Sequence, residues 1–315
     1  MKVYNSSQET GLVNSVVTVG IFDGMHLGHQ ELLKQVIAKS LELGVPALIV
    51  TFWPHPKLYF KPDDSSFSLL MSIEERTLIM ERLGVEHLLV LPFNQRMANT
   101  SAQQFIHDIL VDDLSISHLI LGDDHRFGRD RQGSFEFVSG LANELGFGLT
   151  RMESMLDDKT RISSTAIRDS LRLGEIEKAN KLLGYPYFII GKVVKGKQMG
   201  KKLGFPTANI NCLEKRKQIP HAGVYAVKVM LKGKEHYGML NIGTRPTVES
   251  GGSQSVEVHI FNIEEDLYGE HLEVSFISRI RDEMKFDRLD QLRSQLAIDR
   301  EVVLQLLSGP GPYKK

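Results

Sequence analysis

Apolar and polar positions follow two different patterns along the chain. Between Ser15 and about Ala179, short β-branched apolar runs are followed by amphipathic stretches with the spacing of helices. This alternation predicts a parallel sheet covered by helices on both faces, with ligands at the carboxyl ends of its strands. The expected strands are Val16–Phe22, Ala47–Phe52, His87–Leu91 and His118–Leu121, and the expected helices are Leu27–Leu43, Ile73–Leu83, Ala102–Ile109 and Ser134–Leu145.

The pattern changes near Gly184, where short strands separated by turn residues begin. Such spacing predicts an antiparallel barrel or sandwich, with an amphipathic helix over Leu289–Leu307 packed on it. A chain of 315 residues is long enough for two cores, so we expect domains at 1–183 and 184–315. The expected barrel strands are Phe188–Val194, Val224–Leu231, Tyr237–Ile242, Ser255–Phe261 and Leu272–Ile280.

Composition narrows the class of protein. The formal net charge of −1 argues against a polybasic nucleic-acid binder. No segment approaches the ~20 apolar residues of a membrane span, and the start lacks the apolar run of a signal peptide. The single cysteine, Cys212, excludes an internal disulfide and a multi-cysteine zinc site. We therefore expect a cytoplasmic protein without nucleic-acid or membrane partners. We also expect a monomer or weak homo-oligomer.

The first group of chemically suggestive residues lies where the first strand gives way to a helix. Backbone N–H groups point at a ligand there, and glycines let phosphate oxygens approach the chain. His26 and His29 are three residues apart and face the same way on the first helical turn, where two imidazole donors suit a triphosphate. A pair of surface histidines beside an ordinary glycine turn is the alternative reading. The segment reads Gly20-Ile21-Phe22-Asp23-Gly24-Met25-His26-Leu27-Gly28-His29.

Two further segments favour a nucleotide site over that alternative. Gly122–Gly128, which contains Asp124 and Arg126, follows the strand His118–Leu121. Ser163-Ser164-Thr165 opens another helix with capping hydroxyls and backbone donors, and Arg168 follows one turn later, so this segment can also hold a polyphosphate.

The second group of residues combines glycine, lysine and neutral oxygens. Four glycines among lysines between 191 and 204 make a flexible basic loop with backbone donors for phosphates, although a solvated basic turn has the same composition. Thr207 and Asn209 alternate on an extended segment and present oxygens that could ligate Mg²⁺. Glu257 projects from a strand whose neighbours Val256 and Val258 face the other side; such a carboxylate is either catalytic or simply solvated. The loop residues are Gly191, Gly196, Gly200, Lys201, Gly204 and Pro206.

These motifs together resemble the prokaryotic bifunctional riboflavin kinase/FMN adenylyltransferase (FAD synthetase) family over nearly the whole chain. The adenylyltransferase pattern GxFDGxHxGH is matched from Gly20 to His29, and ISSTxIR from Ile162 to Arg168. The kinase motifs resembled are Gly204–Asn209, Gly223–Tyr225, Asn241–Thr247, Val256–His259, Asp266–Gly269 and Arg281–Phe286. The resemblance implies a Rossmann-like nucleotidylyltransferase domain followed by a six-stranded antiparallel riboflavin kinase barrel with a terminal helix.

The resemblance also implies chemistry and roles. The enzyme would phosphorylate riboflavin to FMN and adenylylate FMN to FAD, using ATP and Mg²⁺. Catalytic roles fall on His26, His29, Arg168 and Glu257, and Mg²⁺ binding falls on Thr207 and Asn209. The adenylyltransferase ATP site would comprise Gly20, Phe22, Asp23, Gly28, Ser164 and Thr165, with Asp124 and Arg126 near the reacting phosphates; the kinase would bind ATP through Gly191, Gly196, Gly200, Lys201, Gly204 and Pro206, and flavin through Arg281 and Glu283.

Two departures from the family pattern leave rival functions open. Trp53 stands in Thr51–Pro56 where an Asp is frequent, and His125 replaces a commoner aromatic. One rival is a single-activity nicotinate or pantetheine-phosphate adenylyltransferase fused to a regulatory barrel. The other is a flavin-binding protein without turnover, which Trp53 favours, although His26, His29, Thr207, Asn209 and Glu257 are all present.

Overall fold

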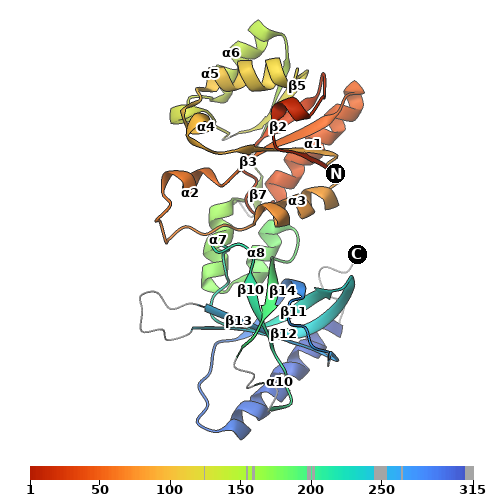
Figure 1. Cartoon of the computed structure of the whole chain (residues 1–315), viewed down its shortest axis with the longest axis vertical. Coiled ribbons are helices and arrows are strands. Elements are labelled where there is room, and N and C mark those ends of the chain that lie inside the picture. The colour runs from red at the N-terminus through yellow and green to blue at the C-terminus, as the bar shows by residue number, and fades with distance from the viewer. Residues whose placement is uncertain are drawn as a thin grey trace. The chain divides into compact units, whose positions relative to one another are not determined.

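The chain divides into two compact units, and Figure 1 shows their helices and strands. Each unit has its own buried hydrophobic cluster. The computed structural model describes residues 1–123, 125–153, 155–157, 160–196, 200, 203–244, 254–263 and 265–308. The first unit comprises Met1–Phe67 and Ile73–Ser163, and the second comprises Ser68–Ser72 and the chain from Ser164 onward.

A parallel six-stranded sheet with the order β1-β4-β3-β2-β5-β6 forms the centre of the first unit. The predicted parallel sheet is therefore confirmed. The chain moves from β2 to β3 on one side and later to β5 on the other, so the strand order reverses at β2, and ligands bind at such a point in open α/β sheets. The strands are β1 Lys2–Tyr4, β2 Val16–Val19, β3 Ala47–Trp53, β4 His87–Pro92, β5 His118–Gly122 and β6 Gly148–Met152.

Helices cover both faces of this sheet because successive strand residues point to opposite sides. Val17, Val19, Leu119 and Leu121 belong to one buried cluster with η2 and α6, whereas α1 packs on β2, β3 and β5 without contributing to that cluster. The helical segments are η1 Ser7–Glu9, α1 Leu27–Leu43, α2 Pro56–Phe60, α3 Ile73–Arg82, α4 Gln95–Asn99, α5 Ala102–Gln104, the π-helix η2 Phe105–Asp113, η3 Arg129–Arg131 and α6 Phe135–Leu145, and a small hairpin joins β7 Leu156–Asp157 to β8 Thr160–Arg161.

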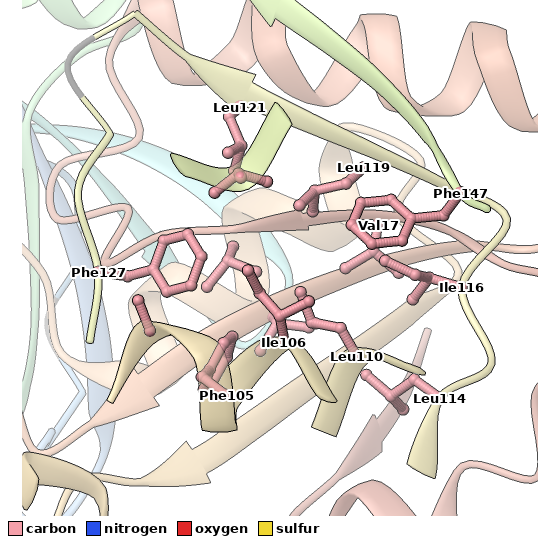
Figure 2. Packing of buried hydrophobic residues seen from close by; sticks show 14 of the residues in the cluster. Val17, Phe105, Ile106, Leu110, Leu114, Ile116, Leu119, Leu121, Phe127 and Phe147 are labelled. Carbon is pink, nitrogen blue, oxygen red and sulfur yellow. The ribbon is translucent and has the colours of Figure 1, made fainter. Parts of the chain in front are cut away.

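Figure 2 shows the cluster between η2 and the sheet. Phe105, Ile106 and Leu110 of η2 face Leu119 and Leu121 of β5. Burial of these side chains, each worth about 1.5–3 kcal/mol, fixes the sheet on which the loops after β2 and β5 are built.

The first strand is shorter than the sequence predicted. The expectation was Val16–Phe22, but β2 ends at Val19. Phe22 and Met25 have φ angles of 52° and 39°, in the left-handed region, so the chain turns away from the sheet directly after Gly20. Both side chains are nonetheless buried, which explains their apolar character.

The second unit contains a closed antiparallel barrel with the order β10-β13-β12-β11-β14-β9, as predicted. Val303 and Leu307 of α10 pack against Ala226 of β11 and Met239 of β12. The elements are α7 Ser164–Leu173, α8 Ile176–Leu183, β9 Phe188–Val194, β10 Ala208–Cys212, β11 Gly223–Leu231, β12 Lys234–Thr244, β13 Gln254–Ile260, β14 His271–Arg281 and α10 Leu289–Ser308.

Candidate active sites

The loop between β2 and α1 holds the first predicted group of residues in a buried, tightly turned conformation. A side chain at Gly20 would meet the Phe22 ring 2.7 Å away, so the glycine is needed for the ring to lie there. Asp23 is 3% exposed. A side chain at Gly28 would lie 3.3 Å from His26 Nδ1, which leaves space for little more than glycine beside the histidine.

His26 and His29 are stacked, with ring centroids 3.6 Å apart and planes 16° from parallel. His26 is the N-cap of α1, and its Nδ1 accepts a hydrogen bond from the His29 backbone N–H at 3.3 Å. Since Nδ1 is an acceptor, the neutral ring carries its proton on Nε2. The structure therefore brings the two predicted histidines together and fixes one of them as an Nε2–H donor.

Both rings are neutral at physiological pH. Burial, with a smaller effect of the Arg161 charge, lowers the pKa of His26 to about 4, although a hydrogen bond to its own backbone and the Asp23 charge act in the opposite direction. Burial holds the pKa of His29 well below its usual value, and the neighbouring His26, Arg76 and His125 would each oppose a second positive charge there. In the ligand-free state the pair consequently acts through hydrogen bonding, and an arriving anion would favour protonation.

The predicted residues of the loop after β5 differ in their exposure. Arg126 is exposed, whereas Phe127 belongs to the core. Asp124, the predicted phosphate-side residue, lies outside the described residues. His125 Nε2 is buried, has no hydrogen-bond partner within the described chain, and its ring is tilted against Phe127. Burial lowers the pKa of His125 to about 4.

Ser164, Thr165 and Arg168 all lie on α7, in the second unit. Ser164 and Thr165 lie in its first turn. Arg168 is 8% exposed and its Nε donates to the Ser68 carbonyl at 2.7 Å.

The second group of residues is assembled by strand pairing in the barrel. Glu257 of β13 is opposite Asn209 of β10 and Asn241 of β12. The Thr207 hydroxyl donates to Glu257 Oε2 at 3.3 Å. Antiparallel register therefore brings together Thr207, Asn209 and Glu257, which lie up to 50 residues apart along the chain.

The predicted glycine loop lies against this cluster. A side chain at Gly196 would collide with the Asn209 amide, and one at Gly200 would collide with the Phe205 carbonyl and lie 3.3 Å from Thr207 Oγ1. Gly191 packs directly on Ile210 and Asn211, and Gly204 has a φ of 81°. Lys201 lies outside the described residues.

Two cavities meet at Thr207. One, of about 240 Å³, is lined by Pro206, Thr207 and the Asp266–Tyr268 turn. The other, of about 430 Å³, is lined on one side by polar groups that include Asn241 and Glu257 and on the other by apolar residues of α10. His259 also lines the larger cavity, and its Nδ1 is 2.7 Å from the Pro206 carbonyl, which ties the start of β10 to β13.

Arg281 and Glu283 both line the larger cavity. The Arg281 guanidinium is bound by Asp299 of α10, with Nε 2.9 Å from Oδ1 and Nη2 2.7 Å from Oδ2. Asp299 is 1% exposed, so this is a buried ion pair that joins β14 to α10. Glu283 lies against Gly243, where a side chain would come within 2.8 Å of its Oε1.

The oxygen donors at this cluster fit Mg²⁺, a hard cation that prefers oxygen ligands and takes others from substrate phosphates. A hydroxyl that donates to Glu257 still has lone pairs for a cation, so the Thr207 hydrogen bond is compatible with metal binding. Within the described residues no group of three or more His, Cys, Asp or Glu side chains could hold a metal. A magnesium ion here would depend on ATP for most of its ligands.

A nucleotidylyltransferase-like α/β unit joined to a closed antiparallel barrel defines a two-domain enzyme of nucleotide chemistry. The family model described as FAD synthetase matches residues 8–166, and the model described as riboflavin kinase matches residues 183–307. The rival of a different adenylyltransferase fused to a regulatory barrel is therefore wrong.

Relatives cover nearly the whole chain. A bifunctional riboflavin kinase/FMN adenylyltransferase from Pseudomonas fluorescens is 39% identical over 95% of this chain and 94% of its own, and one from Bacillus subtilis is 35% identical over 94% and 93%. The chain belongs to the bifunctional riboflavin kinase/FMN adenylyltransferase family and is an enzyme of flavin cofactor biosynthesis.

A solved structure shares the full architecture. The crystal structure described as a macrolide-efflux protein from Streptococcus pneumoniae matches 96% of this chain and 98% of its own, with a TM-score of 0.86 and 33% identity. In the part of the chain that the structure describes, no helix is long and apolar enough to cross a membrane.

Proposed function

We propose that the chain carries out two ATP-dependent reactions, phosphorylation of riboflavin to FMN in the barrel and adenylylation of FMN to FAD in the α/β domain, with the domains divided near 183/184. The observation that carries this proposal is the presence of two separate assemblies of phosphate-binding type, the stacked histidine pair at the β2–α1 loop and the Thr207–Asn209–Glu257 cluster.

In adenylyl transfer, an oxygen of the FMN phosphate attacks the α-phosphorus of ATP, the α–β bridge bond breaks, and pyrophosphate leaves. The attacking phosphate has a second pKa of about 6, so it is already largely ionised and needs no base. Positioning and charge stabilisation then carry the reaction. We assign hydrogen bonding to the reacting phosphates to His26 and His29. We assign binding of the ATP phosphates to the Gly20–Gly28 loop and to Ser164, Thr165 and Arg168. Asp124 and Arg126 lie near the phosphate of FMN in this proposal.

In the kinase reaction, the 5′-hydroxyl of riboflavin attacks the γ-phosphorus of ATP and ADP leaves. An alcohol keeps its proton at neutral pH, so a carboxylate that orients the hydroxyl and accepts that proton accelerates the step. Glu257 takes this role, because it lines the larger cavity beside Thr207. The smaller cavity holds the nucleotide and the larger one the flavin.

The remaining kinase residues hold the substrates. Thr207 and Asn209 bind Mg²⁺, which would neutralise charge on the transferred phosphoryl group. The 191–206 loop, including Lys201, encloses the ATP phosphates, and Arg281 and Glu283 form the flavin side. Arg281 does so by holding α10 against the cavity, because Asp299 already occupies its guanidinium.

One incubation tests the assignment. Purified protein is mixed with riboflavin, ATP and Mg²⁺, and flavins and nucleotides are followed by chromatography. We expect FMN with ADP first, and then FAD with pyrophosphate. If FMN accumulates without FAD, only the kinase activity is supported. If no FMN forms but added FMN is converted to FAD, only the adenylyltransferase activity is supported. The absence of both products would favour a flavin-binding protein without turnover.

A further inference from the structure

One fully buried arginine lies outside every motif used so far. Arg76 is 0% exposed and shares the buried face of α3 with Ile79 and Met80, at helical spacing. Arginine is almost never fully buried unless it is paired. Burial lowers the pKa of Arg76 to about 10, so the guanidinium still carries its charge at neutral pH.

Hydrogen bonds hold one end of this guanidinium toward the adenylyltransferase loop. Arg76 Nη1 donates to Thr51 Oγ1 at 2.9 Å, and the Thr51 hydroxyl donates in turn to the Ile21 carbonyl at 3.3 Å. Ile21 lies inside the Gly20–His29 segment. The arginine is thus connected through one hydroxyl to the loop that carries the catalytic histidines.

The other edge of the guanidinium is unused. Nε and Nη2 of Arg76 are buried and have no hydrogen-bond partner within the described chain, and the same holds for His29 Nδ1 and His125 Nε2. Each unsatisfied buried polar group costs about 1–3 kcal/mol, so several of them in one region require an explanation such as a ligand. Arg76 and His125 both lie within electrostatic range of the His29 ring.

Trp53 keeps the positive charge of Arg76 available. Its ring lies 5.6 Å from the guanidinium carbon, at the position where the family frequently has an Asp. A carboxylate there would pair with the arginine, whereas an indole face stabilises the cation without neutralising it. The buried acid whose charge acts on Arg76 is Asp23.

We infer that Arg76 is a further catalytic residue of adenylyl transfer, whose unused Nε–Nη2 edge binds non-bridging phosphate oxygens of ATP beside His29. This edge presents two parallel N–H donors, the geometry that matches phosphate oxygens in a bidentate contact. A charge already buried and oriented stabilises the anion that develops during pyrophosphate departure without further reorganisation. The inference rests on the proposed FMN adenylyltransferase function.

The test compares Arg76→Met, Arg76→Lys and the control Arg82→Met, which changes an exposed arginine on the same helix. FAD formation from FMN and ATP is the main readout. Arg76→Met should lower its kcat/KM by a factor on the order of 10²–10³, the usual loss for one preorganised donor group. Arg76→Lys should recover part of the lost kcat/KM, because lysine restores the charge but not the two-donor edge. Arg82→Met should match the wild type.

Three further measurements separate catalysis from folding. Phosphorylation of riboflavin by the same preparations should not change. Thermal unfolding followed by fluorescence of Trp53, the single tryptophan, should show that ligand-free Arg76→Met is at least as stable as the wild type, since two unpaired buried donors are removed. Inorganic pyrophosphate should raise the unfolding temperature of wild type and Arg82→Met more than that of Arg76→Met.

Three outcomes are distinguishable. Wild-type FAD formation by Arg76→Met would overturn the inference. A loss of FAD formation that accompanies lower stability but an unchanged response to pyrophosphate would also overturn it and assign Arg76 a structural role. Failure of the wild type itself to make FAD would instead contradict the proposed function.

Discussion

In the proposed mechanism, adenylyl transfer depends most directly on the two stacked histidines. His29→Ala removes one preorganised hydrogen-bonding group, so FAD formation should fall by a factor on the order of 10²–10³. FMN formation should be unaffected, because the kinase residues belong to the barrel. Chromatography of both products from the same preparation measures the two effects together. Unchanged FAD synthesis would remove His29 from the mechanism.

Glu257 has the corresponding role in the proposed kinase mechanism. Glu257→Gln keeps the size of the side chain and can still accept from Thr207, but it removes the charge and basicity. FMN formation should fall by about 10²–10⁴, the range for loss of general-base catalysis. The same variant supplied with FMN should still make FAD. Near-normal kinase activity would assign the base to another group, and an equal loss of both activities would indicate misfolding.

Burial of His26 also predicts a pH dependence of stability. An unfolded histidine binds a proton below about pH 6.5, whereas folded His26 resists protonation until about pH 4. The unfolded state therefore binds more protons between these values, and stability falls as pH falls from 6.5 to 4, by an amount on the order of 3 kcal/mol from this residue. Above pH 6.5 the contribution is constant.

The variant His26→Asn isolates this effect, because Asn is also a good N-cap but does not titrate. Urea unfolding followed by Trp53 fluorescence at several pH values reports on the first unit. The midpoint of the wild type should decline more steeply toward low pH than that of His26→Asn. Parallel slopes would show that the folded ring takes up a proton without penalty.

At the scale of elements, the Arg281–Asp299 pair fixes α10 beside the larger cavity. Asp299→Ala leaves the arginine charge unpaired at a site where Asp299 is 1% exposed and Arg281 17%, so the barrel should lose about 3 kcal/mol of stability. The KM for riboflavin should rise because α10 supplies the apolar wall, including Leu292 and Leu296. FAD formation from FMN should not change.

The control for this prediction lies on the same helix. Asp290 pairs with Arg288, but both side chains are more than half exposed. Asp290→Ala should therefore cost less than about 1 kcal/mol. If the two variants have equal stability and equal KM for riboflavin, the buried pair does not position α10.

The sequence predicts some elements accurately and misses others for identifiable reasons. Helix α1 and strand β9 begin and end where the apolar spacing predicts, because each has a distinct period and turn residues at its ends. Where strand β10 forms, the sequence predicts only an extended segment that includes Thr207 and Asn209, since Ala208–Cys212 contains two asparagines and is held by pairing with distant β9 and β13. The expected helix at Ala102–Ile109 instead becomes a π-helix from Phe105, a change in winding that an apolar pattern does not encode.

The same distinction applies to the candidate sites. The glycine, histidine and Thr207–Asn209 motifs could be found because they are contiguous in sequence. Arg76 could not, because its hydrogen bonds and its burial come from tertiary packing. The one sequence feature that could have pointed to Arg76 is its charge at a position of α3 where the helical period favours an apolar residue.

At the scale of the whole molecule, the two compact units and the two family matches divide the chain at slightly different places. The units separate between Ser163 and Ser164, so α7 and α8 are grouped with the barrel, whereas the riboflavin kinase match begins at residue 183. Asn180 of α8 explains the grouping. It is fully buried, its Nδ2 donates to the Phe276 carbonyl at 2.9 Å, and its Oδ1 accepts from the Tyr187 N–H at 2.7 Å.

A fragment comparison tests this division. Fragments 164–315 and 184–315 should both phosphorylate riboflavin without making FAD, because the Thr207–Asn209–Glu257 cluster and both cavities lie within either one. The shorter fragment leaves the Phe276 carbonyl and the Tyr187 N–H without Asn180, at a cost of about 1–3 kcal/mol for each group that stays buried. Urea unfolding should therefore show a lower midpoint for 184–315. Both fragments lack Ser68–Ser72, so its loss does not affect the comparison. Equal midpoints would mean that α8 contributes nothing to the barrel, and a folded but inactive 164–315 would mean that the kinase needs the adenylyltransferase domain.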